Sequence, residues 1–117
     1  PAAAQRLRPP DLVVVADVLQ HVGDVGPVLG AAAGAAAAGG VMVLTAETPL
    51  LGGEPGGGDG WALTGTGHFQ HGREYLRRAA EEAGWEVVAE EPLVVDVSRG
   101  GEEPKPAPAV AMAMRRG

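Results

Sequence analysis

Two carboxylates and an imidazole follow an apolar run of the sequence, residues 11–16. Asp17, His21 and Asp24 all come soon after that run. A carboxylate can bind a ligand amine or hydroxyl, and an imidazole, which titrates near neutral pH, can accept a proton from one. We therefore predict a site at the end of this run, with His21 as a candidate catalytic base. The alternative is that His21 packs over the end of a strand and that Asp17 caps a turn.

Three further polar residues are candidates for contacting a substrate. Glu47 follows a second apolar run. Ligands bind beyond the carboxyl ends of parallel strands, so Glu47 is expected to face the same crevice unless it only shapes a turn. His68 and His71 are three residues apart, a spacing that binds a metal only when a third ligand lies nearby. No third ligand is evident, so we expect no metal and place both histidines on the substrate side.

The first half of the chain reads as strand, helix and strand. Residues 11–16 form a continuous β-branched run, which is typical of a strand covered on both faces in a parallel sheet. A helix is predicted over residues 24–38 and a second strand over residues 41–45. Short connections between these segments predict a right-handed βαβ unit.

Four residues define that helix further. Asp24 is placed to cap its start, and Pro27 is tolerated in its first turn. Gly30 and Gly34 share one helix face, at a cost of about 1 kcal/mol each relative to alanine. We expect these glycines to let the helix backbone approach the sheet.

The second half of the chain predicts one more helix and an antiparallel hairpin. Residues 73–83 carry an apolar stripe at helical spacing, and Gly84 follows as the C-cap. Residues 85–89 form a strand, extended structure continues after Pro92, and residues 110–115 return alongside it. The predicted fold class is α/β: a Rossmann-like partial sheet of parallel strands with a C-terminal antiparallel hairpin, flanked by helices.

Two segments have no predicted regular structure. Residues 1–10 form an irregular leading segment, because proline pairs continue neither a helix nor a central strand. Residues 50–70 are too rich in glycine for a stable strand and lack a helical period. This long segment leaves from the carboxyl edge of the sheet, so we predict a mobile lid over the substrate side.

Composition excludes several classes of function. The chain has 117 residues, enough for one domain at most, and a formal charge of -6 with a pI near 4.9, which argues against nucleic acid as a partner. No apolar run reaches the roughly 20 residues that span a bilayer, so we expect no membrane partner. The chain has no cysteine, which excludes disulfide frameworks and fits a cytoplasmic location.

Three stretches resemble a known family. They are "DLVVVADVLQHVGD", "AAAAGGVMVLTAETP" and "GHFQHGREYLRRAAEEAGWEVV". In this order they resemble the C-terminal half of class I S-adenosylmethionine-dependent methyltransferases of the small-molecule type, including those linked to tetratricopeptide repeats in bacteria. The resemblance implies S-adenosylmethionine as cofactor and methyl transfer to a small-molecule nucleophile. It also implies that Ala16, Asp17 and Val18 line the methionine end of the cofactor.

Several features of the family are missing from this sequence. The acidic-Gly-x-Gly loop after the first strand is absent, and so is the acid that holds the ribose hydroxyls. His68 stands where relatives often carry arginine. We therefore interpret residues 11–117 as the C-terminal half of a methyltransferase domain whose N-terminal cofactor-binding half is absent, a fragment that is inactive alone.

The missing half leaves one structural expectation and two alternatives. The strand over residues 11–16 would have an unpaired apolar edge, which invites association with another chain. The first alternative is a non-catalytic remnant that has lost its cofactor site. The second is half of another Rossmann-like enzyme, such as a nicotinamide-dependent oxidoreductase.

Overall fold

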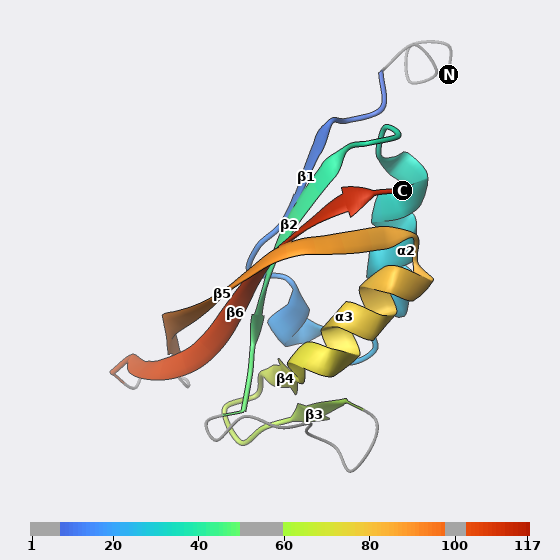
Figure 1. The fold of residues 1–117 in the computed structure, drawn as a ribbon. Helices are drawn as coiled ribbons and strands as arrows, with labels where there is room; N and C mark the ends of the chain where they lie inside the picture. The colour runs from blue at the N-terminus through green and yellow to red at the C-terminus, as the bar shows by residue number, and fades with distance from the viewer. Residues whose placement is uncertain (1–7, 50–59, 98–102) are drawn as a thin grey trace, which may run out of the picture.

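The computed structural model describes residues 8–49, 60–97 and 103–117. Within these residues, the main sheet has four strands in the order β1-β2-β6-β5 (Figure 1). Their bounds are β1 (Leu12–Val15), β2 (Val41–Glu47), β5 (Trp85–Val97) and β6 (Lys105–Arg116).

The strand directions bring three carboxyl ends to one edge of the sheet. β1 pairs with β2 in parallel, and β6 is antiparallel to both of its neighbours, β2 and β5. β5 therefore runs in the same direction as β1 and β2. These directions confirm the predicted α/β class, a Rossmann-like sheet of parallel strands that ends in an antiparallel hairpin.

One face of the sheet carries the core. Helices α2 (Gly26–Ala35) and α3 (Arg73–Glu82) both lie on this face, together with the short 3-10 helix η1 (Leu19–His21) (Figure 1). Alternate residues of β2 point toward them, so that Met42 and Leu44 are fully buried. The apolar stripe predicted for residues 73–83 packs there, and no helix in the described part of the chain is long and apolar enough to cross a membrane.

The opposite face is bare in the described part of the chain. Leu12 and Val14 of β1 are 57% and 62% exposed, whereas Val15 is buried. The prediction that this strand is covered on both faces was therefore wrong for the described residues. β1 is also an edge strand of the sheet, because it pairs with β2 alone in the strand order.

Helix α2 differs from the prediction in three details. Its N-cap is Val25, although the Asp24 carboxylate still accepts a hydrogen bond of 3.0 Å from the Gly26 amide. The helix ends at Ala35, earlier than predicted. A Cβ atom at Gly30 or Gly34 would meet nothing within 4 Å, so the expected close approach of these glycines to the sheet was wrong.

The C-terminal hairpin is longer than the sequence indicated. β5 continues through Pro92, which pairs with Val110, because β5 is an edge strand and proline lacks only the outward-facing amide. A register shift between Val87 and Ala89 marks a β-bulge.

Residues 60–70 include strand residues, contrary to the prediction of a structureless loop over residues 50–70. Strands β3 (Trp61–Leu63) and β4 (Phe69–His71) form an antiparallel hairpin next to β2. The Trp61 ring holds this hairpin in place by packing against the core and by an edge-to-face contact with Phe69. The rest of the predicted lid, residues 50–59, lies outside the described residues.

Candidate functional site

A small pocket lies where the carboxyl ends of β1, β2 and β5 meet. It has a volume of about 70 Å³. The first segment after β1, the end of β2 and the end of β5 each contribute a carboxylate to its wall. The lining residues are Asp17, Gln20, Thr45, Ala46, Glu47, His68, Val95, Asp96, Val97 and Ala109.

Asp17 turns the chain from β1 into η1. Its φ angle is 56°, in the left-handed region that aspartate tolerates better than most residues. This turn puts an exposed carboxylate at the pocket. Of the three residues predicted to contact the cofactor, Asp17 lines the pocket, whereas Ala16 and Val18 are not among its lining residues.

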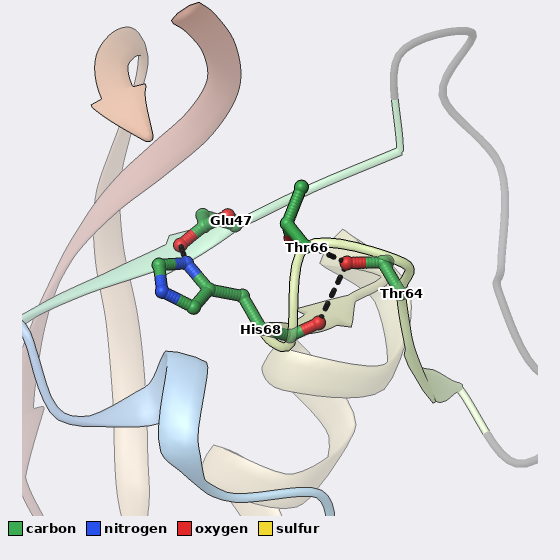
Figure 2. A network of polar contacts seen from close by, with 4 residues as sticks. All are labelled: Glu47, Thr64, Thr66 and His68. Carbon is green, nitrogen blue, oxygen red and sulfur yellow. Dashed lines mark hydrogen bonds and ion pairs between the residues drawn. The ribbon is translucent and has the colours of Figure 1, made fainter. Parts of the chain in front are cut away.

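Glu47 and His68 form a hydrogen-bonded pair across the pocket wall. The His68 Nδ1 atom lies 2.6 Å from the Glu47 Oε2 atom, and the two side chains are 24% and 11% exposed (Figure 2). An ionised carboxylate only accepts hydrogen bonds, so His68 carries a proton on Nδ1. The second ring nitrogen, Nε2, points away from Glu47 in Figure 2.

The tight turn between β3 and β4 fixes His68. The Thr64 hydroxyl donates a hydrogen bond of 2.8 Å to the His68 carbonyl oxygen, and the Thr66 hydroxyl lies 2.8 Å from that of Thr64 (Figure 2). Gly67 has a φ angle of 84°, which favours glycine at this point of the turn. The backbone that presents His68 is therefore well constrained.

His21, the residue predicted as a catalytic base, lies beside this pair. Its ring makes an edge-on contact with the His68 ring, with centroids 5.8 Å apart and an interplanar angle of 76°. His21 is exposed and is not among the lining residues of the pocket, where its neighbour Gln20 appears. The structure thus brings His21, His68 and Glu47 together, with His21 on the outside.

His71 occupies a different position from His68. Its side chain is fully buried, and its Nε2 atom lies 2.7 Å from the Val22 carbonyl oxygen and 3.0 Å from that of Gly23. Since carbonyls only accept, the proton is on Nε2, and Nδ1 has no hydrogen-bond partner among the described residues. Burial lowers the pKa of His71, although the two backbone hydrogen bonds and the Glu47 charge oppose this shift.

The contacts of His71 anchor the segment after η1. The ring stacks on Tyr75 with centroids 6.2 Å apart, and the Tyr75 hydroxyl accepts a hydrogen bond of 2.9 Å from the Val25 amide. His71 lines neither this pocket nor the larger one beside it. The geometry therefore supports a structural part for His71 rather than the predicted contact with substrate.

A second, larger pocket continues from the first on the far side of Glu47. Its volume is about 320 Å³, at the lower end of the range for small-molecule sites. Glu47 and Val97 line both pockets. The lining residues of the second pocket are Glu47, Thr64, Thr66, Gln70, Val97, Lys105, Pro106 and Ala107.

Sequence reasoning missed Asp96 and Lys105. Asp96 lies in the apolar stretch "VVDV" near the end of β5. Had the direction of β5 been known, its carboxyl end would have placed Asp96 at the same edge as Glu47. The described residues contain no cluster of three or more histidine, cysteine, aspartate or glutamate side chains that could hold a metal ion.

Comparison with known proteins gives matches at the level of structure. No family model matches the sequence, and no curated protein is similar to it. A methyltransferase from Methanosarcina mazei superposes with a TM-score of 0.65 at 12% identity, over 92% of this chain and 59% of its own. Magnesium protoporphyrin IX methyltransferase from Synechocystis, solved with SAH, gives 0.60 at 18% identity, over 97% of this chain and 48% of its own.

A third similar structure is the N-methyltransferase NodS from Bradyrhizobium japonicum, in complex with S-adenosyl-L-homocysteine. Its TM-score is 0.54 at 19% identity, over 91% of this chain and 45% of its own. Each superposition thus covers nearly all of this chain but less than two thirds of the other protein. It therefore has the Rossmann-like fold of S-adenosylmethionine-dependent methyltransferases, over a part of their length.

Proposed function

We propose that this chain is the acceptor-side half of an S-adenosylmethionine-dependent methyltransferase that acts on a small molecule. A donor-binding half with a glycine-rich loop would complete the enzyme. The convergence of three strand ends on one pocket, in a fold shared with such methyltransferases, carries the proposal.

The bare face of the sheet supports the proposal that a donor-binding half completes the enzyme. Leu12 and Val14 expose apolar surface, and β1 has a free edge in the described part of the chain. Further strands pairing with β1 would satisfy its backbone groups, and helices of the other half would cover the apolar face.

The residues present suit only one end of the donor. Asp17 offers a carboxylate to the donor's ammonium group, but a pocket of about 70 Å³ is far too small for the whole molecule. When bound, the donor supplies a methyl group on a sulfonium sulfur. This chain would orient the two reactants and exclude water, and alignment alone can contribute about 7–11 kcal/mol to such a reaction.

A methyl-transfer assay on the full-length protein tests the proposal. We expect formation of S-adenosylhomocysteine with a small phenol or amine. Asp17→Asn removes the charge but keeps a residue that tolerates the left-handed backbone, so a change in activity would not reflect a distorted turn. We expect the KM for S-adenosylmethionine to rise by about 10- to 100-fold, as for the loss of one charged hydrogen bond.

Two results would contradict this assignment. Tight binding of NADH, with no binding of S-adenosylmethionine, would identify an oxidoreductase instead. Failure of the full-length protein to bind either molecule would identify a remnant without a cofactor site.

A further inference from the structure

The Glu47–His68 pair has the geometry of a positioned base. We propose that His68 takes the proton from the acceptor molecule during methyl transfer, and that Glu47 is the positioning residue that holds the imidazole in its reactive form. This inference rests on the proposed function. It assigns the chemistry to His68, whereas the pattern of the sequence pointed to His21.

The hydrogen bond to Glu47 determines the tautomer of His68. The Glu47 side chain is only 11% exposed, and a carboxylate with so little access to water needs a hydrogen-bond donor, which the His68 Nδ1 atom supplies at 2.6 Å. With its proton on Nδ1, the neutral ring has its lone pair on Nε2. No hydrogen bond to Nε2 is made within the described part of the chain, and this atom points away from Glu47 (Figure 2).

Two pockets adjoin the Glu47–His68 pair. His68 lines the smaller pocket together with Asp17 and Glu47, and Glu47 also lines the larger one. An acceptor in the larger pocket would therefore extend past Glu47 toward His68. The Glu47 charge would stabilise the imidazolium that forms when Nε2 takes up a proton.

The acceptor oxygen or nitrogen forms a bond to the methyl carbon while the carbon–sulfur bond breaks. The electron pair of that bond stays on sulfur, which becomes a neutral thioether. The acceptor proton moves to His68 Nε2, and water later removes it from the imidazolium.

The decisive variant is His68→Arg in the full-length protein. Arginine offers an N–H donor to Glu47 but has no lone pair, so it can preserve the hydrogen bond to the carboxylate while it removes the base. With phenol, which keeps its proton near neutral pH, we expect kcat to fall by about 10²- to 10⁴-fold. With thiophenol, which is mostly ionised above neutral pH, we expect kcat to stay within about threefold, because no base is needed.

Equal rates of the His68→Arg variant and the unaltered protein with phenol would overturn the proposal. Glu47→Gln should lower kcat with phenol and leave the KM for S-adenosylmethionine unchanged. The matched control is Glu81→Gln, which makes the same substitution at an exposed position of α3. Thermal melts check that all variants are folded.

A second measurement needs no acceptor. Nitrogen-15 NMR of the imidazole should show the proton of His68 on Nδ1 in the unaltered protein, and partly on Nε2 in Glu47→Gln. An unchanged tautomer would refute the positioning role of Glu47. If the protein made no S-adenosylhomocysteine at all, the proposed function would be wrong. The NMR measurement of the His68 tautomer would still test whether Glu47 positions the ring.

Discussion

Replacement of His71 tests whether this buried histidine holds the segment that follows η1. His71→Leu removes the donor that bridges the Val22 and Gly23 carbonyl oxygens at 2.7 and 3.0 Å. An unsatisfied buried acceptor costs about 1–3 kcal/mol, and these two residues are only half-buried, so water can reach part of the gap. We expect the free energy of unfolding to fall by about 2 kcal/mol.

The pH dependence of the free energy of unfolding tests the state of His71 independently. The pKa of His71 is lowered by burial from its ordinary value of 6.5, so the folded protein keeps this ring neutral. The unfolded chain binds a proton as the pH falls through 6.5, whereas the folded chain binds it only at a lower pH, so stability is lost as the pH falls below 6.5. The slope is at most about 1.4 kcal/mol per pH unit.

Urea unfolding at a series of pH values measures both effects. The difference in the free energy of unfolding between the unaltered protein and His71→Leu should shrink as the pH falls from neutrality. Only the unaltered protein contains His71, so only it loses stability through the lowered pKa of this residue. His71→Gln, whose side-chain amide can still donate hydrogen bonds, should lose less stability than His71→Leu. A difference in stability that is constant with pH, or an equal loss in both variants, would refute the proposed state of His71.

Three other predictions concern backbone and surface. The double variant Gly30→Ala and Gly34→Ala should raise the free energy of unfolding by about 1–2 kcal/mol, because the new methyl groups meet nothing within 4 Å; a loss in urea unfolding would contradict this. Gly84→Ala should lower it by about 1–2 kcal/mol, since Gly84 has a φ angle of 97° and its Cβ would lie 2.9 Å from Arg116 Nη1; unchanged stability would contradict this. Val14→Lys should reduce association of the isolated chain in analytical ultracentrifugation, and equal association would exclude the bare face as its cause.

Periodicity predicted the elements that depend on local signals. The apolar stripe of residues 73–83 and the glycine at position 84 defined α3 almost to the residue. The run over residues 11–16 predicted a strand, but an apolar sequence cannot reveal whether both of its faces find partners. Pro92 obscured the length of β5, because only the sheet order shows that this strand lies at an edge.

The site was predictable only in part, because local sequence does not show how strands and turns pack together. Asp17 and Glu47, which the sequence puts after two strands, line the same pocket. His68 and His71 looked alike in the sequence, yet the β3–β4 hairpin directs one toward Glu47 and buries the other against backbone carbonyls. That difference depends on the turn and on the packing of β4, which sequence spacing does not encode.

Calorimetric titration with S-adenosylmethionine tests the central claim most directly. The full-length protein should bind the donor with micromolar or tighter affinity. This chain alone should bind it weaker by orders of magnitude, because it retains Asp17 but lacks the glycine-rich loop and the ribose-binding acid, and each missing polar contact is worth about 0.5–1.5 kcal/mol. Micromolar binding by the chain alone would contradict the assignment of this chain to the acceptor side of the enzyme.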